Sequence, residues 1–382
     1  MFKKFSLVLF GLGVITSANA TDLMDVYQQV LAADPRVRLA AINIQIGEDR
    51  ESQVMADLLP QLSVSSSIST VRQDFEGKTS GSDRKSFKGE RYSAVLSQSL
   101  FDLPKFYNWQ RQQKMTNQFS HDQLEIQQQI MLDVVLRYFE VLSAQDNLTV
   151  AENEKVVTQG ILKQLKRQYE KQLVKITDLM AAQARSDFAN AQVIEAQTTL
   201  IIAKEQLTEL TGSPVKTLKP LWKGFEFQPV EGDVKKWLAL LTANNPKLLS
   251  KNDAIAAEKL GIKQQRSGHL PVVDFQLMVQ RTDMGFNSST IGLTNITSAS
   301  VNVNMPLFSG GKTSALHSEA VHRLEASKLE YETEFRKLRR ELIGYLTGIN
   351  ASVEKIKAAK TALDSANKNY KSMNKGFKYG VV

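Results

Sequence analysis

The segment Ser309-Gly310-Gly311-Lys312-Thr313 has the residue types of a phosphate-binding loop, in which backbone N–H groups and a lysine hold phosphate. The pattern G-x-x-x-x-G-K-[ST] requires glycine at position 306, and this chain has Pro306 there. The alternative is a glycine-rich corner at which a strand turns into a helix. We favour the corner, because the pattern is broken at a position that the phosphate site needs.

The histidines and the basic run do not complete a catalytic or metal site. His317 and His322 are five residues apart and therefore do not share a helical face, and no acidic partner completes a metal site. His121 and His269 are isolated. The basic run over residues 336–340 is typical of a solvated helix face, although it could line a tunnel wall. The chain has no cysteine, which excludes thiol and disulfide chemistry. We therefore predict no enzyme activity and no cofactor.

Residues 1–20 are predicted to be a secretory signal peptide. Lys3 and Lys4 precede a short apolar stretch, and Ala18-Asn19-Ala20 fits a cleavage site. An uncleaved anchor is the alternative, but the apolar stretch is too short to span a bilayer. Removing the two lysines lowers the formal charge from +8 to +6. This modest charge and export both argue against a nucleic-acid partner.

The chain repeats its own pattern after about 210 residues. Asp34-Pro35 recurs as Asn245-Pro246, a shift of 211, and Leu100-Phe101 recurs as Leu307-Phe308, a shift of 207. Such a long period indicates a duplicated module rather than a solenoid of short repeats. We predict a first repeat over 21–211, a linker over 212–231 and a second repeat over 232–382.

Each repeat contains two strands with alternating apolar and polar residues. The strands are expected at about 62–73 and 91–101, and at about 272–282 and 296–308, joined by polar loops over 74–89 and 283–295. One face of the second pair is apolar, and its residues are predicted to face lipid: Val273, Phe275, Leu277, Val279, Val301 and Val303. A soluble sheet packed on a core is the alternative, but no apolar helix layer is available to cover it. Four strands cannot close a membrane barrel, so several copies would have to share one.

Long helices follow each strand pair. They are expected at about 103–170 and 175–210 in the first repeat and at about 311–375 in the second. Apolar residues spaced by seven, such as Leu124, Met131 and Tyr138, indicate coiled-coil packing. A helix of 68 residues spans roughly 100 Å, several times the thickness of a membrane. The predicted fold class is therefore an α+β membrane protein with long antiparallel helices continuous with a shared antiparallel barrel.

Motifs along nearly all of the mature chain resemble those of the TolC family of outer-membrane efflux and secretion ducts. They occur in the family's order at residues 32–35 (A-A-D-P), 59–62 (L-P-Q-L), 98–102 (Q-S-L-F-D) and 306–311 (P-L-F-S-G-G). The segment from Arg167 to Leu179 resembles the family's helix junction. No single motif is decisive, but their order and duplication together are specific.

The resemblance implies a homotrimer in the outer membrane of a Gram-negative bacterium, with a helical tunnel in the periplasm. It implies three copies that each give four strands to one barrel, a periplasmic adaptor, and an inner-membrane pump or ABC transporter that supplies energy. It also implies that Thr177 and Asp178 help to tie neighbouring helices in the closed tunnel; simple helix capping is the alternative. The type I secretion branch matches slightly better than drug efflux.

A soluble periplasmic coiled-coil or adaptor protein without a pore is the main rival reading. The second repeat also has no counterpart of the helix expected at 175–210, because residues 377–382 align with residues 169–174 and the sequence stops. We therefore expect a C-terminally truncated chain that assembles poorly and does not seal.

Overall fold

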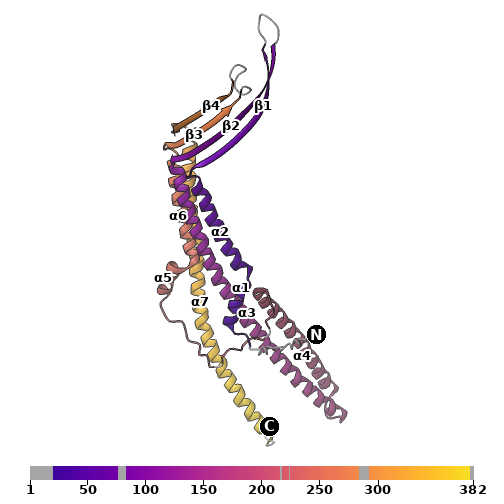
Figure 1. The fold of residues 1–382 in the computed structure, drawn as a ribbon. Helices are drawn as coiled ribbons and strands as arrows, with labels where there is room; N and C mark the ends of the chain where they lie inside the picture. The colour runs from indigo at the N-terminus through magenta and orange to yellow at the C-terminus, as the bar shows by residue number, and fades with distance from the viewer. Residues whose placement is uncertain (1–19, 76–82, 216, 223, 284–291, 379–382) are drawn as a thin grey trace, which may run out of the picture. The chain divides into compact units, whose positions relative to one another are not determined.

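The computed structural model describes residues 20–75, 83–215, 217–222, 224–283 and 292–378. The predicted signal peptide, apart from Ala20, lies outside the described residues, as do the centres of both predicted strand loops and the last residues of the chain. Figure 1 shows the elements in chain order: α1 (Leu23–Ala33), α2 (Pro35–Ala56), β1 (Gln61–Phe75), β2 (Asp83–Phe101), α3 (Leu103–Glu170), α4 (Ile176–Thr211), α5 (Val234–Asn244), α6 (Pro246–Ser267), β3 (Val272–Thr282), β4 (Thr294–Asn304) and α7 (Lys312–Lys378).

The predicted combination of long helices with a four-stranded antiparallel sheet is confirmed. The strands pair in the order β1-β2-β3-β4, and every neighbouring pair is antiparallel. α3 has 68 residues and spans the predicted range, whereas α4 and α7 each begin one residue later than predicted. No helix in the described part of the chain is both long and apolar enough to cross a bilayer.

The duplication is visible in the short helices. α1 and α5 both have 11 residues, α2 and α6 both have 22, and each pair is displaced by 211 positions. The first helix of each pair ends at an acidic or amide residue, Asp34 or Asn245, and a proline opens the next helix. Proline is well suited to this place because the first turn of a helix needs no N–H donor.

The chain forms two compact units, and these do not coincide with the two repeats. One unit contains residues up to Arg38 together with Ile126–Glu226, and the other contains Leu39–Glu125 together with the chain from Phe227 onward. The core of the first unit joins α1, α3 and α4 through buried apolar side chains, among them Val26, Val30, Ile130, Val134, Val141 and Leu207. The hydroxyl group of the buried Tyr138 donates a hydrogen bond to the carbonyl oxygen of Lys219, at 2.6 Å.

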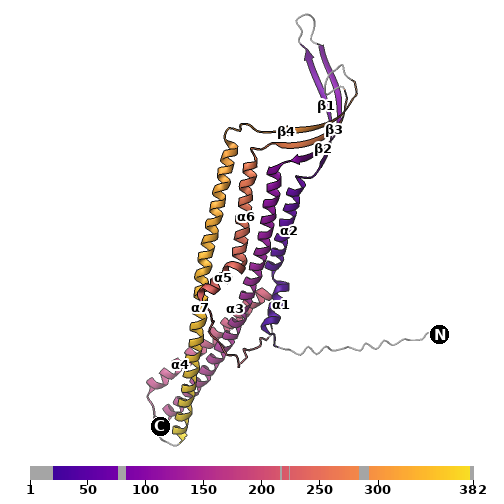
Figure 2. The same cartoon turned by 90° about the vertical axis from the view of Figure 1, so that its left-hand side faces the viewer.

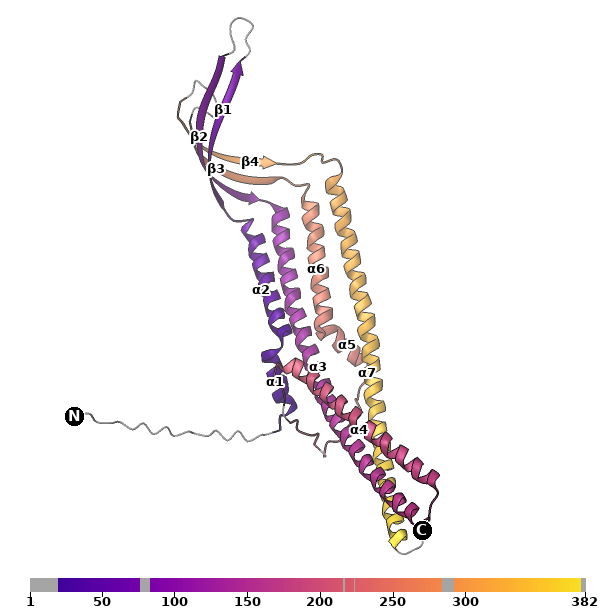
Figure 3. The same cartoon turned by 90° about the vertical axis from the view of Figure 1, so that its right-hand side faces the viewer.

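The second unit contains the sheet and the helices that continue from its strands. Figures 2 and 3 show α2, α3, α6 and α7 side by side, in the same lateral order as β1 to β4. This order follows from the connections, because each of these helices directly precedes or follows one strand. The α2 and α7 helices therefore lie at the two flanks of this layer.

The predicted loop over 74–89 is wrong in part, because β2 begins at Asp83 rather than near Arg91. The residues from Asp83 onward pair in register with the chain back to Phe75. This stretch is polar and carries no apolar alternation, so the sequence pattern did not reveal it. Backbone hydrogen bonds between strands do not need apolar side chains, so the hairpin extends beyond its apolar part.

The second-repeat strand predicted over 296–308 is also corrected. β4 begins at Thr294 and ends at Asn304, before Met305 and Pro306. Proline lacks the N–H group that a strand ladder requires, which accounts for the early end. Gly310 and Gly311 then adopt positive φ values of 62° and 83° in the turn that leads into α7.

Candidate functional site

The six apolar residues predicted on the second strand pair all lie on one face of the sheet. The register places Val273 opposite Val303 and Phe275 opposite Val301, and Leu277 and Val279 follow on the same face. Leu277 in turn lies opposite Leu96, which lies opposite Leu62 on β1. An apolar surface therefore crosses all four strands. Several of its side chains are largely exposed in one chain: Leu62, Val64, Ile68, Val279, Val301 and Val303.

The opposite face of the sheet is polar and carries its own hydrogen bonds. Ser99 Oγ donates to Asp274 Oδ1 at 2.9 Å, and Lys105 Nζ donates to Ser99 Oγ at 2.8 Å. Farther along the strands, the hydroxyls of Ser65 and Ser93 lie 2.7 Å apart. Hydroxyl, amide and carboxylate groups on this face favour contact with water, so the sheet can separate an apolar medium from an aqueous one.

The sheet has two free edges among the residues that the structure describes. β1 pairs only with β2, and β4 pairs only with β3. In an apolar medium each unpaired backbone group at such an edge costs several kcal/mol. The two edges therefore need either water or further strands.

The junction between α3 and α4 contains Thr177 and Asp178. α3 ends at Glu170, and Gln172, two residues later, has a φ of 58°. The N–H of Leu173 donates to the carbonyl oxygen of Gln168 at 2.9 Å. This is a Schellman ending in which glutamine takes the place usually held by glycine. Asp178 Oδ2 accepts the N–H of Lys175 at 3.3 Å, which is a capping contact at the start of α4. Thr177 is exposed in the same turn.

A charged cluster that the sequence reasoning missed surrounds the elbow between α1 and α2. Arg36 donates from its backbone N–H to Asp34 Oδ1 and from its guanidinium to Asp34 Oδ2, both at 2.8 Å. Its other terminal nitrogen bonds to Asp133 Oδ2 on α3, also at 2.8 Å. Burial alone would raise the pKa of the Asp34 carboxyl, but the hydrogen bonds from Arg36 outweigh burial and hold that pKa below its usual value.

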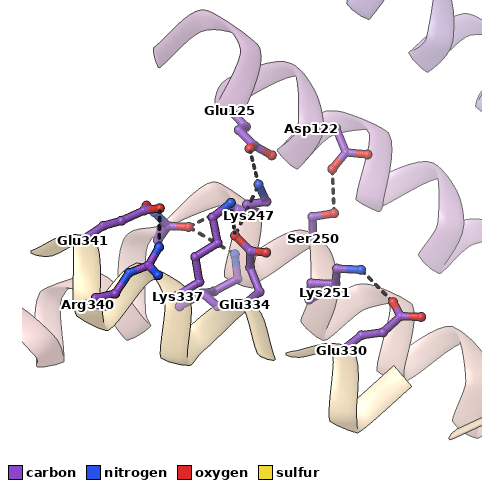
Figure 4. Close-up of polar contacts among 12 residues, drawn as sticks. Asp122, Glu125, Lys247, Ser250, Lys251, Glu330, Glu334, Lys337, Arg340 and Glu341 are labelled. Carbon is purple, nitrogen blue, oxygen red and sulfur yellow. Dashed lines mark hydrogen bonds and ion pairs between the residues drawn. The ribbon is translucent and has the colours of Figure 1, made fainter. Parts of the chain in front are cut away.

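The elbow between α5 and α6 carries the corresponding cluster in the second unit (Figure 4). Lys247 Nζ lies 3.1 Å from Glu125 Oε1 on α3 and 3.3 Å from Glu334 Oε1 on α7. Burial alone would lower the pKa of the Lys247 ammonium, but the two carboxylates outweigh burial and raise it. The available sequence signal was that a cation follows the repeated proline in both halves, as Arg36 and as Lys247.

The remaining candidate groups serve structural contacts. The glycine-rich segment is a corner between β4 and α7, in which the Ser309 and Thr313 hydroxyls lie 2.9 Å apart. His121 is not isolated, because its Nε2 lies 3.3 Å from Asp253 Oδ2. In the basic run, Arg336 and Arg340 are exposed and pair with glutamates of their own helix. Within the described residues, no group of three or more His, Asp or Glu side chains is placed to hold a metal ion.

Three known proteins show what this chain is similar to. It is 27% identical to the alkaline protease secretion protein AprF of Pseudomonas aeruginosa, over 95% of this chain and 77% of AprF. It is also 27% identical to the outer membrane protein TolC of Escherichia coli K12, over 99% of this chain and 78% of TolC. The crystal structure of the outer membrane protein VceC from Vibrio cholerae shares the fold, with a TM-score of 0.75 at 13% identity, over 94% of this chain and 86% of VceC.

A protein-family model described as outer membrane efflux protein matches residues 26–213 and 237–382. This match takes in most of the chain and includes both repeats, the sheet with its two unlike faces, and the helix junction. The chain belongs to the outer membrane efflux protein family.

Proposed function

We propose that this protein is a passive exit duct in the outer membrane of a Gram-negative bacterium, acting in efflux or in type I secretion. The observation that carries the proposal is the sheet, which has one apolar face, one hydrogen-bonded polar face and, within the described part of the chain, two free edges. The family to which the chain belongs consists of outer membrane efflux proteins, which are transport proteins and not enzymes.

In this proposal the apolar face contacts lipid. Val273, Phe275, Leu277 and Val279, with Val301 and Val303, would form the outward band, and the face with Ser99 and Asp274 would line water. Strands of 11 residues match the length that a tilted strand needs to cross a bilayer. Burying the exposed apolar side chains in lipid is favourable, whereas the polar face would lose its solvation there.

The free edges support a closed barrel shared by several chains. Four strands are fewer than the roughly eight that the smallest membrane barrels contain. Three copies would supply twelve strands, which corresponds to the homotrimer implied by the family resemblance. Closure would satisfy the backbone groups at the outer edges of β1 and β4.

The long helices would extend the duct into the periplasm. A helix of 68 residues, such as α3, is about 100 Å long, against a hydrocarbon core of about 30 Å. The duct would have no energy source of its own. We propose that it receives cargo through a periplasmic adaptor from an inner-membrane pump or ABC transporter.

Relatives with a secretion name favour the secretion branch. AprF is named an alkaline protease secretion protein. PrtF of Dickeya chrysanthemi is named a proteases secretion protein and is 26% identical over 85% of this chain. TolC relatives of comparable identity carry no cargo in their names. We therefore propose secreted protein as the first cargo class to test and small molecules as the second.

Membrane fractionation with conductance measurement tests the duct itself. The protein is expected to stay with outer membranes after a carbonate wash and to form discrete ion-conducting channels in planar bilayers after purification. A soluble periplasmic coiled-coil or adaptor protein, the competing interpretation, would leave the membranes in carbonate and would not conduct. That result would refute the duct.

A further inference from the structure

The hairpin of β1 and β2 reaches beyond the other two strands of the sheet (Figure 1). β1 has 15 residues and β2 has 19, whereas β3 and β4 have 11 each. β1 and β2 pair without a break in register from Gln61 and Ser97 to Phe75 and Asp83. The two faces of the sheet can therefore be followed along this hairpin beyond Arg91, the last residue of β2 that pairs with β3.

The apolar face of the sheet becomes cationic along this hairpin. Every second residue of a strand lies on the same face, so on β1 this face runs from Leu62 to Arg72. On β2 it runs from Leu96 to Lys88, and Lys88 lies opposite Thr70. Arg72 and Lys88 are therefore diagonal neighbours, with a spacing of about 7–8 Å that long side chains can bridge. Both side chains are exposed.

The position of the two cations fits the outer boundary of a bilayer. Arg72 lies ten positions beyond Leu62 on β1, and the face between them carries Val64 and Ile68. Ten residues of strand rise about 33 Å, which at the tilt of a barrel strand covers about 25 Å, the height of the apolar band of such barrels. The helices α2 and α3 continue from the opposite ends of these two strands and would lie in the periplasm in the proposed duct. The two cations would therefore lie among the lipid headgroups of the outer leaflet.

Cations on the two faces of the hairpin differ in their partners. On the polar face, Arg91 Nε donates to the hydroxyl of a threonine on β3, at 3.4 Å. On the apolar face, the side chains of Arg72 and Lys88 form no hydrogen bond or ion pair within the described part of the chain. Glu90 lies on the same face two positions from Lys88, and its carboxylate accepts the hydroxyl of Tyr92 at 3.1 Å. Two cations at the end of the apolar face are therefore left to pair with an anion from outside the chain.

We infer that Arg72 and Lys88 bind the phosphate groups of an anionic glycolipid in the outer leaflet of the outer membrane. Guanidinium and ammonium groups pair with phosphate oxygens through charge-assisted hydrogen bonds. Val64 and Ile68 continue the same face and would contact the acyl chains of that lipid, which a soluble phosphate lacks. The contact would fix the depth of the sheet in the membrane. This inference rests on the outer-membrane duct proposed above and specifies a lipid that the duct binds.

Lipid binding by the purified protein tests the site. The protein is extracted from outer membranes in a neutral detergent and titrated with lipid A, and the bound fraction is measured by native mass spectrometry. Arg72→Gln/Lys88→Gln is expected to weaken lipid A binding about 25-fold, since each cation near an anionic lipid surface contributes about a factor of five. Arg72→Lys/Lys88→Arg keeps both charges and should bind nearly as well as wild type. Lys368→Gln/Lys371→Gln removes the same charge from an exposed part of α7 and should leave the affinity unchanged.

A second titration, on wild type alone, does not depend on the folding of any variant. Lipid A from which the phosphates have been removed is expected to bind about 25-fold more weakly than lipid A, because it leaves both cations without an anion. The folding of each variant is checked separately by its mobility on a gel run without heating. Only the folded fraction enters the comparison of affinities.

Three results would overturn the lipid site and leave the duct standing. The first is equal affinity of wild type for lipid A and for its dephosphorylated form. The second is an equal loss of affinity in Arg72→Gln/Lys88→Gln and in the control on α7. The third is displacement of lipid A by an equal concentration of inorganic phosphate, which would indicate a site for soluble phosphate. A protein that leaves the membranes in carbonate and does not conduct would overturn both the lipid site and the duct.

Discussion

Lys247 occupies in the second repeat the position that Arg36 occupies in the first, and both cations reach a carboxylate on a long helix. Each is the second residue of a 22-residue helix and follows a proline. Arg36 bonds to Asp133 of α3 at 2.8 Å, whereas Lys247 lies between Glu125 of α3 and Glu334 of α7. The second cation therefore joins helices of both repeats.

Lys247→Met should destabilise the protein by about 1–3 kcal/mol, because it removes the ammonium group that lies 3.1 Å from Glu125 and 3.3 Å from Glu334, which then retains, among the described residues, only the contact with Lys337 at 3.8 Å. Lys251→Met is the matched control. Its partner Glu330 is 62% exposed, so the loss should stay below about 1 kcal/mol. The measurement is thermal unfolding followed by circular dichroism in detergent. Equal losses in the two variants would contradict the bridging role of Lys247.

The pH dependence of that contribution has a definite sign. The pKa of Lys247 is raised in the folded protein, so its contribution is present below the unfolded pKa of about 10.4. It is lost as the pH rises through the folded pKa. Wild type and Lys247→Met should therefore approach each other in stability as the pH rises into strong alkali.

Asp34→Asn should lower stability at neutral pH by about 1–2 kcal/mol, because it weakens the hydrogen bonds with Arg36. The folded pKa of Asp34 lies below its unfolded value of about 3.9, so this stabilisation is present above that pH and is lost as the pH falls. The difference in free energy of unfolding between wild type and Asp34→Asn should therefore become smaller below about pH 4. Unfolding measured at several pH values checks this. Glu48→Gln is the control at an exposed position and should change the stability little. If the difference in free energy of unfolding between wild type and Asp34→Asn stayed the same at every pH, the prediction would be refuted.

Leu277→Arg should cost about 2–4 kcal/mol if its position lies near the bilayer midplane. Gln276→Arg, on the opposite face of the same strand, should be tolerated because that face would line water in the proposed duct. Each variant is folded into lipid vesicles, and the folded fraction is measured from its mobility on a gel run without heating. The folded fractions of the two variants are then compared. Equal effects would show that the assignment of faces is wrong.

Asp178→Ala should increase entry of antibiotic or dye through the closed duct without lowering the yield of oligomer. The family resemblance motivates this role, whereas the bond from Lys175 N–H to Asp178 Oδ2 favours simple capping. Asp178→Asn keeps an acceptor and removes the charge, so leakage in both variants would support an electrostatic tie. Unchanged closed-state conductance with a stability loss of about 0.5–2 kcal/mol in the alanine variant would favour capping.

Gln172→Gly should stabilise the end of α3 by about 1 kcal/mol, because a residue with a side chain is strained at φ 58°. Gln168→Gly, inside the same helix, should destabilise by a similar amount. Thermal unfolding of the two variants gives the comparison. A loss of stability in Gln172→Gly would mean that the glutamine side chain contributes a contact that outweighs the strain.

The sequence by itself determined the local elements and their duplication. Pro35 and Pro246 each begin a helix, and alternation along residues 272–282 sets the two faces of β3, because both effects depend on neighbouring residues alone. The range of α3 could be predicted for the same reason. The start of β2 at Asp83 could not, since its polar residues gain strand structure only from the partner strand.

Only the tertiary structure decided which distant groups meet. Leu96 lies opposite Leu277, and Lys247 lies between Glu125 and Glu334, although these residues are far apart in the sequence. Such pairings depend on the register of helices and strands, which the packing of the whole layer sets. Polar contacts carry no periodic signal in the sequence. The hydrogen bond between Ser250 of α6 and Asp122 of α3 therefore could not be predicted from the sequence.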